Sequence, residues 1–387
     1  MTHDADSPPK TPKSMNDPRL LELKPSLDLN TEDQYLLKEF FENICQLSVE
    51  NSKTIEREPV TLALMSRENP FWAAGRAVAI WQDQTSTLIG FAHPEQKLNG
   101  EAACFFGYFA CAKDAHAAQP VFAKLRAWSQ QMGAKKIVGP IQFKTAYDYR
   151  LRMDSFSEKT FWGEPQNPEH HIAALEEAGF AITQEYFTDF ILELENVRHI
   201  AHRKLSRATL AIGARSPGRP TNQPHIEPFS LALFNRHRGE IFNLANSLFA
   251  GNAAFQPLNQ FDFNVLYPEA LLKSICQNTS FLIFDNEGKL RGLCLSFAHP
   301  TDPECLLIKT IGIDAGFRNG GRTFVEALKF IFERSTSYQR LAFCLMTKGN
   351  QVHRLTQKYS DHRRRYALFA KDVALDHSAF SKIENAE

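Results

Sequence analysis

A strand, a glycine-containing loop and a helix follow one another within residues 309–329 of this chain. Residues 311–313 are apolar and predict the end of a strand, the loop 317–322 has the sequence FRNGGR, and residues 323–333 have the spacing of an amphipathic helix. A helix that begins after such a loop leaves backbone N–H groups unpaired, and glycine lets an anion come close to them. The order of these elements therefore predicts an α/β arrangement with a phosphate site at the N-terminus of the helix.

Two arginines in this loop strengthen the prediction of a phosphate site. Arg318 and Arg322 each offer a planar cation that can bind phosphate oxygens at two points. The loop is not a Walker loop, because no Gly-Lys-Ser/Thr follows it, and it lacks the three glycines of the dinucleotide fingerprint. Its spacing is Arg-x-x-Gly-x-Thr, with Gly321 and Thr323 in the last two defined positions. Strand-turn-helix units with one or two glycines are common, so an ordinary structural connection is the alternative.

Length and composition limit the class of protein. A length of 387 residues predicts two domains. Basic and acidic side chains are equal in number, 44 each, which argues against a protein that coats nucleic acid. No apolar run approaches the roughly 18 residues of a membrane-spanning helix. Residues 1–29 are polar and rich in proline, which predicts a disordered tail and no signal peptide. We therefore expect a cytoplasmic enzyme.

The cysteines give no sign of a metal site. The seven cysteines form no C-x-x-C pair and show no Cys/His spacing typical of a metal ligand set, so we expect reduced thiols and no metal. Several of them, such as Cys111 and Cys344, lie in apolar strand-like runs, where cysteine acts as a small hydrophobe. A nucleophilic Cys344 is the alternative, although no sequence signature places a base beside it.

The chain carries the same order of elements twice. Short strands, a helix and another strand follow one another in each half, so that residues 104–140 correspond to residues 306–346. The predicted boundaries are a disordered tail at 1–29, a first domain with a leading helix at 30–194, a basic connector at 195–224, a second domain at 225–375 and a flexible tail at 376–387.

Over residues 57–372 the sequence resembles tandem, two-domain bacterial members of the GNAT acyltransferase superfamily. The loop at 318–323 is similar to the GNAT pyrophosphate loop, Gln/Arg-x-x-Gly-x-Gly/Ala, and departs from it at the last position. GYFAC at 107–111 and LEEAGF at 175–180 follow the order seen in the first half of these proteins, and 246–263 resembles their helical substrate-side segment. The resemblance implies an α/β (α+β) fold with two GNAT-like domains, each a mixed, mostly antiparallel, splayed sheet flanked by helices.

The resemblance also implies an activity, the transfer of an acyl group from CoA to a primary amine. Acyl-CoA is the donor substrate, no metal takes part, and the amine attacks the thioester directly in a ternary complex. The pantetheine arm is expected to bond the backbone of Ile311, Gly312 and Ile313. The pyrophosphate is expected to lie on Arg318, Asn319, Gly320, Gly321, Arg322 and Thr323.

Three residues in and around the last helix are candidates for catalysis. Asn350 resembles the residue at which the last GNAT helix begins. The acid usually assigned in the superfamily is a tyrosine, but this chain has Thr356 and Gln357 in the expected place, with Tyr359 one turn away. His353 is a candidate base or acid because histidine titrates near neutral pH. A packed tyrosine and a surface histidine are the alternatives for the last two.

The first half departs from the GNAT pattern after its matching strand, because residues 113–120 contain no glycine. We expect this half not to bind CoA and to form one wall of the acceptor site. Candidate acceptor contacts in the loop 139–157 are Phe143, Tyr147, Asp148, Tyr149 and Arg150. Further candidates in the second half are Phe255 and Phe261. Simple packing between the two domains is the alternative for these side chains.

The sequence leaves the acceptor and the partners open. A long-chain or lipid amine is one specific version, because bacterial ceramide synthases also resemble tandem GNAT proteins and the chain has 31 phenylalanines. Basic residues in the connector are compatible with peripheral contact with a membrane, and a solvated helix is the alternative. No nucleic-acid partner is expected. The functional alternatives are a transferase that uses aminoacyl-tRNA and a non-catalytic CoA-binding or scaffold protein.

Overall fold

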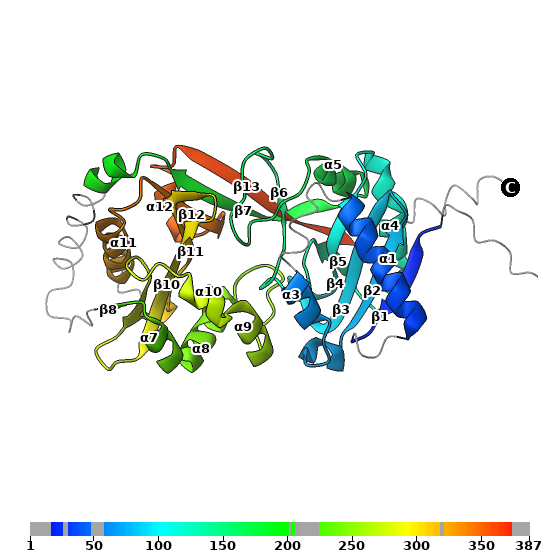
Figure 1. The fold of residues 1–387 in the computed structure, drawn as a ribbon, viewed down its shortest axis with the longest axis horizontal. Helices are drawn as coiled ribbons and strands as arrows, with labels where there is room; N and C mark the ends of the chain where they lie inside the picture. Colours follow the sequence, from blue (N-terminus) through cyan, green and yellow to red (C-terminus); the bar gives the residue numbers. More distant parts are fainter. Residues whose placement is uncertain are drawn as a thin grey trace, which may run out of the picture.

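The computed structural model describes residues 17–25, 30–47, 58–200, 203, 205, 207, 224–317 and 321–373. In this part of the chain the two halves lie end to end in an elongated molecule (Figure 1). Arg318, Asn319 and Gly320 of the predicted phosphate loop lie outside the described residues. So do most of the predicted connector and the predicted tail at 376–387.

The first half contains strands β1 to β7 and the helices around them. Its strands are β1 (Arg19–Leu23), β2 (Arg76–Gln82), β3 (Ser86–Leu98), β4 (Glu101–Cys111), β5 (Lys136–Gly139), β6 (Leu151–Arg152) and β7 (Ala181–Ile191). Its helices are α1 (Thr31–Leu47), α3 (Glu58–Leu64), α4 (Gln119–Gln131) and α5 (His170–Glu177), with short 3₁₀ turns η2 (Pro70–Ala73) and η3 (Ala115–Ala118).

The second half contains strands β8 to β13. Its strands are β8 (His225–Pro228), β9 (Phe281–Phe284), β10 (Leu290–His299), β11 (Asp302–Ile313), β12 (Arg340–Thr347) and β13 (His362–Asp372). Its helices are α7 (Leu231–Arg236), α8 (Arg238–Phe249), α9 (Gln260–Leu266), α10 (Glu269–Lys273), α11 (Arg322–Arg334) and α12 (Gln351–Thr356), with the 3₁₀ turn η4 (Ala315–Phe317).

Within the described chain, one mixed sheet of 13 strands runs through both halves. Its strands lie in the order β1-β2-β3-β4-β5-β13-β7-β12-β11-β10-β9-β8, and β6 pairs with β13. β4 pairs in parallel with β5, and β11 with β12, while the other paired strands are antiparallel. The predicted fold class, a mixed and mostly antiparallel sheet flanked by helices, is confirmed.

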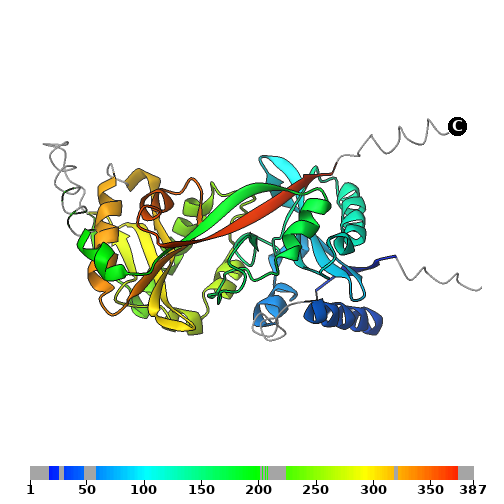
Figure 2. The ribbon, with the colours of Figure 1, turned by 90° about the horizontal axis from the view of Figure 1, so that it is seen from above.

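The two halves exchange their last strands. β13 pairs with β5 of the first half through residues 369–372 and with β7 along most of its length. β7 in turn pairs with β12 of the second half. Figure 2 shows β7 (green) and β13 (red) running side by side along the molecule. The predicted division at 194/195 therefore follows the order of the chain, whereas the sheet crosses it, and the domain boundaries stay a prediction.

The prediction of a disordered tail over residues 1–29 is wrong for Arg19–Leu23. This segment is β1, which pairs antiparallel with β2 from Arg19 opposite Trp81 to Leu23 opposite Ala77. Leu21 and Leu23 are buried, and Glu22 between them is exposed. Backbone pairing with β2 and the burial of two leucines stabilise this strand in spite of its polar surroundings.

β11 and β12 are splayed. They pair in parallel only from Cys305 opposite Arg340 to Ile308 opposite Phe343. At the point where they separate, β11 has a bulge on its β10 side, because Leu295 lies opposite Thr310 while Ser296 lies opposite Ile308. An extra residue in one strand bends that strand locally. The bulge therefore lies at the point where β11 and β12 part.

Helix α11 packs on the sheet beside this splay. It buries Phe324, Ala327, Leu328 and Ile331, which lie one helical turn apart and contact β11 and β12 residues. Burial of each large apolar side chain contributes about 1.5–3 kcal/mol. This packing holds the N-terminus of α11 next to the end of β11.

Candidate functional site

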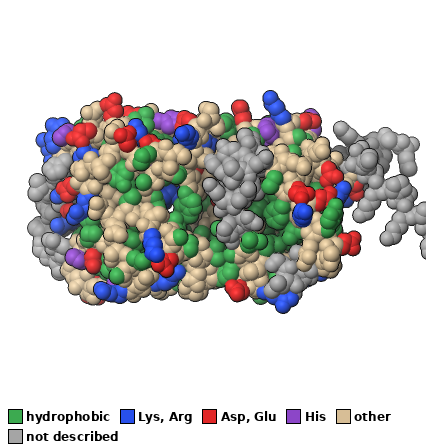
Figure 3. Space-filling view, in the orientation of Figure 1, with side chains coloured by type: hydrophobic (Ala, Val, Ile, Leu, Met, Phe, Trp, Pro, Cys, Tyr) green, Lys and Arg blue, Asp and Glu red, His purple; other side chains and the backbone are tan. Residues whose placement is uncertain are grey.

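A cavity of about 1660 Å³ lies where the two halves meet. The loop between β5 and α5 forms one side of it, and β11, β12, α8 and the start of α12 form the other. Hydrophobic side chains gather around the middle of the molecule in Figure 3, and charged side chains lie mainly on the outer surfaces. Both halves therefore contribute side chains to the walls of the cavity, which are a mixture of apolar, aromatic and charged groups.

The splayed end of β11 is one wall of the cavity. Ile311, Gly312 and Ile313 all line it, as predicted for contacts with a pantetheine arm. In the described chain β12 offers them no backbone partner, since its pairing with β11 ends at Ile308. Backbone groups that face β12 beyond this point are therefore available to a ligand. A role in binding stays a prediction.

The N-terminus of α11 reaches the same cavity. Gly321 lines it and adopts φ 95°, a left-handed conformation that favours glycine. Thr323 is fully buried and its Oγ1 donates to the carbonyl oxygen of Phe317 (2.9 Å). The threonine that departs from the GNAT loop pattern thus closes the loop on itself. Among the described residues the buried Nε of Arg322 has no hydrogen-bond acceptor.

The three predicted catalytic residues lie in different surroundings. Asn350 lines the cavity and caps α12, because its side chain accepts from the N–H of Val352 (2.7 Å). His353 is buried, stacks on Phe187, and lies outside the cavity wall. Tyr359 is half-buried beyond the end of α12 and also lies outside this wall.

The Nδ1 atom of His353 lies 2.8 Å from the carboxylate of Asp189, which is fully buried on β7. The same carboxylate accepts from Thr356 Oγ1 (2.6 Å) and from Arg363 Nε (2.7 Å). His353 therefore belongs to a buried polar network that ties α12 to the two exchanged strands.

The predicted aromatic contacts of the first half divide into two groups. Tyr147 and Tyr149 line the cavity, whereas Phe143 is buried in the core of the first half, where its ring lies 4.5 Å from that of Phe91. In the second half Phe255 lines the cavity, and Phe261 packs against the same core as Phe143. The local sequence does not show which of these residues line the cavity and which pack in the core, because all of them are aromatic residues in loops or at helix ends.

Asp262 fixes the loop that carries these tyrosines. Its carboxylate accepts from Lys144 Nζ (2.6 Å) and from Tyr147 Oη (2.7 Å), and it also caps α9 through the N–H of Asn259 (2.9 Å). Burial, followed by the charge of Asp262, raises the pKa of Tyr147 well above its ordinary value. One buried carboxylate of the second half thus holds the loop of the first half against the cavity.

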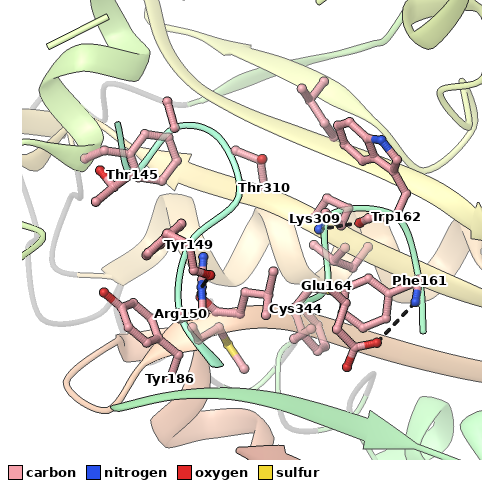
Figure 4. A pocket seen from close by; sticks show the side chains of 18 of the residues that line it. Thr145, Tyr149, Arg150, Phe161, Trp162, Glu164, Tyr186, Lys309, Thr310 and Cys344 are labelled. Carbon is pink, nitrogen blue, oxygen red and sulfur yellow. Dashed lines mark hydrogen bonds between the residues drawn. The ribbon is translucent and has the colours of Figure 1, made fainter. Parts of the chain in front are cut away.

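Sequence reasoning missed Lys309 as a cavity residue. Its Nζ donates to the carbonyl oxygen of Trp162 (2.9 Å) and lies 4.9 Å from the centre of the Phe161 ring (Figure 4). A lysine within the apolar run CLLIKTIGI was the available signal, since such runs rarely carry a charge. Cys344 lies on the same cavity wall, and burial raises the pKa of its thiol to about 12. This shift argues against the alternative of a nucleophilic Cys344.

In the first half, two histidines of α5 bond the backbone at the end of β4. His171 Nε2 accepts from the N–H of Cys111 (3.3 Å), and His170 Nε2 donates to its carbonyl oxygen (2.9 Å). Cys111 corresponds to Ile313 in the repeat. Side chains of α5 thus bond the backbone of Cys111, whereas the matching residue of the second half, Ile313, lines the cavity. That only the second half binds CoA stays a prediction.

Cys111, His170 and His171 place their potential metal-ligand atoms within 4.8 Å of one another. The sequence spacing gave no sign of this group, because Cys111 is distant in sequence from the two histidines. Both imidazoles are already bonded to the backbone of Cys111, which accounts for their positions without a metal.

A solved structure has a fold similar to that of this chain. A protein from Enterococcus faecalis V583, described as a probable N-acyltransferase, superimposes with a TM-score of 0.52 at 12% sequence identity, over 92% of this chain and 73% of that chain. The chain has the fold of this probable N-acyltransferase. This likeness concerns the fold, and the mixed sheet flanked by helices that the resemblance implied is confirmed at that level.

Two further solved structures are similar at lower scores. A tandem GNAT protein from the clavulanic acid biosynthesis pathway has a TM-score of 0.43 at 8% identity, over 93% of this chain and 100% of that chain. A GCN5-related N-acetyltransferase from Anabaena variabilis has a TM-score of 0.46 at 11% identity, over 92% and 73% of the two chains. No protein-family model and no curated protein sequence matches this chain. Among the described residues, every helix is too short or too polar to cross a bilayer.

Proposed function

We propose that this protein is an N-acyltransferase that moves an acyl group from CoA to a primary amine. The observation that carries the proposal is the splay between β11 and β12, which opens beside the N-terminus of α11 into the cavity between the two halves. A splayed strand pair offers free backbone groups to an extended arm, and a helix N-terminus favours a phosphate. The fold shared with a probable N-acyltransferase supports the same activity.

The donor lies along the second half in this proposal. The pantetheine arm bonds the backbone of Ile311 to Ile313, and the pyrophosphate lies on the N–H groups and Gly321 at the start of α11. Arg322 supplies a cation, and its buried Nε has no acceptor among the described residues. Arg318, Asn319 and Gly320 complete the phosphate loop by sequence. Thr323 keeps the loop closed through its bond to Phe317.

The reaction proceeds by direct attack of the amine in a ternary complex. The neutral amine nitrogen forms a bond to the thioester carbon, the carbon–sulfur bond breaks, the nitrogen loses one proton, and the departing thiolate gains one. Asn350 is the predicted catalytic residue that lines the cavity. His353 and Tyr359 lie outside its wall and, in this proposal, do not contact the substrates.

The acceptor enters between the two halves. Tyr147, Tyr149 and Phe255 line the cavity and offer aromatic surface to it. Ligand pockets commonly have volumes of about 300–1,000 Å³, so a cavity of about 1660 Å³ has room for a pantetheine arm together with an acceptor. This size supports two substrates bound at once.

Thermal stabilisation by CoA thioesters tests the donor site. A ligand at 100 times its dissociation constant stabilises a protein by about 2.7 kcal/mol, so acetyl-CoA or palmitoyl-CoA is expected to raise the melting temperature of the wild type. The rise is expected to disappear in Arg318→Glu and Arg322→Glu. Lys329→Glu on the same helix is the matched control, because Lys329 pairs with Glu333 away from the loop. If no thioester stabilises the wild type, the proposed function is wrong.

A further inference from the structure

Arg150 is a buried cation on the wall of the cavity. Only 7% of its surface is exposed, and its guanidinium lies 3.7 Å from the centre of the Tyr149 ring and 4.3 Å from that of Tyr186. Its Nε donates to the carbonyl oxygen of Tyr149 (3.2 Å) and its Nη1 to that of Leu345 (3.4 Å). A guanidinium has five N–H donors, so most of them are left for a ligand or for water.

The other buried cations of the described chain either pair with a carboxylate or donate to more backbone oxygens than Arg150 does. Arg364 pairs with Glu158 and Glu164, and Lys144 pairs with Asp262. Arg152 donates to three backbone carbonyl oxygens. Among the described residues no carboxylate forms an ion pair with Arg150. A buried charge without a counter-ion is costly unless something else neutralises it.

Arg150 is also held in an unusual backbone conformation. Its φ is 71°, in the left-handed region that non-glycine residues seldom adopt. Its N–H donates to the carbonyl oxygen of Pro140 (2.8 Å), which holds this conformation in place. Strained backbone of this kind is often found where a side chain must point into a functional site.

Lys309 is a second cation on the same cavity wall, on the bulge of β11. Its Nζ donates to one carbonyl oxygen, that of Trp162, and forms no ion pair with a described carboxylate. Burial lowers the pKa of Lys309 more than the neighbouring Cys344 raises it, and the charge of Arg150 lowers it further. The two cations therefore act on each other across the cavity, and Figure 4 shows both of them in this part of its wall.

Two acids, Glu164 and Asp148, act on Lys309 through their charge. Glu164 accepts from Arg364 Nη1 (2.8 Å), from the N–H of Phe161 (3.1 Å) and from Tyr366 Oη. Asp148 lines the same cavity, and its charge raises the pKa of Lys309 less than burial lowers it. Within the described chain, neither Arg150 nor Lys309 thus forms an ion pair with a carboxylate.

We propose that the acceptor is an amine that also carries an anionic group, a carboxylate or a phosphate, and that Arg150 and Lys309 bind this group. The proposal rests on the proposed N-acyltransferase activity and narrows its acceptor. Lys309 lies on the same strand as Ile311 to Ile313, so an anion bound there is next to the acyl donor. The rings of Tyr149 and Tyr186 shield Arg150 from water and strengthen its attraction for an anion.

Matched amines test this acceptor class. Acyl transfer from acetyl-CoA is measured with propylamine, β-alanine and 2-aminoethyl phosphate, and with octylamine and 8-aminooctanoate. Charge-assisted hydrogen bonds contribute enough for kcat/KM with an acidic amine to exceed that with its uncharged partner by about tenfold or more. β-Alanine and 2-aminoethyl phosphate distinguish a carboxylate from a phosphate. Equal kcat/KM for acidic and uncharged amines contradicts the proposal.

Variants connect the preference to the two cations. Arg150→Gln and Lys309→Met are each expected to reduce the ratio of kcat/KM for acidic over uncharged amines by about tenfold. Arg365→Gln and Lys348→Met are the controls, because these exposed cations pair with Asp154 and Glu185 outside the cavity. A preference that survives in both cavity variants contradicts the proposal.

A binding measurement separates this proposal from the proposed function. Malonate, compared with chloride at constant ionic strength, is expected to raise the melting temperature of the wild type and of the controls, but not of Arg150→Gln or Lys309→Met. A protein that uses acetyl-CoA but shows neither anion binding nor acidic-amine preference contradicts the acceptor proposal alone. A protein that binds malonate but neither binds nor uses acetyl-CoA contradicts the proposed function, and the acceptor proposal with it.

Discussion

Leu248 of α8 occupies the space that a side chain on Gly312 of β11 would need. A Cβ atom at Gly312 would lie 2.4 Å from Leu248 Cδ1, closer than real Cβ atoms come to a neighbour. Both residues line the cavity. Glycine at this position therefore lets α8 pack directly onto the strand segment that is proposed to bind pantetheine.

Gly312→Ala is expected to push Leu248 away from β11. Overpacking of this kind costs about 1–3 kcal/mol in the free energy of unfolding, and the displaced leucine narrows the proposed pantetheine site, so acyl-CoA should also bind more weakly. Urea unfolding and thermal stabilisation by acetyl-CoA measure the two effects.

The double variant Gly312→Ala/Leu248→Ala shows whether this contact is the cause. We expect it to be more stable than the sum of the two single changes predicts, because the clash is absent when Leu248 is truncated. Gly316→Ala is the control, since a Cβ there would meet only Asp314 Oδ1 at 3.5 Å. Strict additivity would contradict the interpretation.

The repeat of elements was predictable because its pattern is local. Residues 104–140 and 306–346 carry the same apolar pattern, and the structure gives each segment a strand, a helix and a parallel strand. The exchange of β7 and β13 was not predictable in this way. Each strand has a run of buried residues that does not show which half it pairs with. Only the three-dimensional pairing reveals the neighbours of these strands.

The cavity residues show the same limit of sequence reasoning. Tyr147, Phe143 and Arg150 lie within one short loop, yet the structure directs them to Asp262, to the core of the first half and to the cavity, respectively. Backbone conformations such as the positive φ values of Phe143 and Arg150 set these directions. Residue types alone do not show which positions of a loop adopt such conformations.

The strand exchange predicts that neither half folds alone. A fragment that ends at residue 200 leaves β5 and β7 without β13 between them, and a fragment that begins at residue 224 leaves β12 and β13 without β7. Unpaired edges of this length favour aggregation. We therefore expect each fragment to be insoluble when expressed singly, and the two to copurify as one species when coexpressed.

Gel filtration and circular dichroism measure this outcome. The full chain with a protease site inserted between residues 207 and 224 is the control, since it has the same break after folding is complete. A monomeric fragment 17–200 that unfolds cooperatively on its own would show that the exchanged strand is dispensable.

His353→Phe is expected to act on stability and not on catalysis. Phenylalanine preserves the stack on Phe187 but removes one of the donors to the buried carboxylate of Asp189. Loss of a partner to a buried charged group costs about 1–3 kcal/mol in the free energy of unfolding. Thr356→Val removes another donor to the same carboxylate and is expected to have an effect of similar size.

Denaturant unfolding combined with steady-state kinetics decides the role of His353. A loss of stability in both variants with kcat retained is the expected result. A large fall in kcat for His353→Phe, with stability unchanged and Thr356→Val fully active, would instead support the catalytic role suggested by the sequence.

His171 is expected to make the stability of the protein depend on pH. Burial, together with the charge of His170, lowers the pKa of His171 in the folded protein to about 3. In the unfolded chain a histidine has a pKa of about 6.5. Below this value the unfolded state binds a proton that the folded state does not, so the contribution of His171 to stability is complete above pH 6.5 and is lost as the pH falls toward 3.

The size of the effect follows from one proton. The free energy of unfolding should fall by up to about 1.4 kcal/mol per pH unit below 6.5, which amounts to about 2 kcal/mol at pH 5. His171→Gln keeps an acceptor for the N–H of Cys111 but cannot titrate. The stability of this variant should therefore fall less than that of the wild type between pH 7.5 and pH 5, while His116→Gln, a change at an exposed histidine, should follow the wild type. Parallel pH profiles for the wild type and His171→Gln would mean that His171 is not held neutral, and that α5 does not close the end of β4 as the hydrogen bonds indicate.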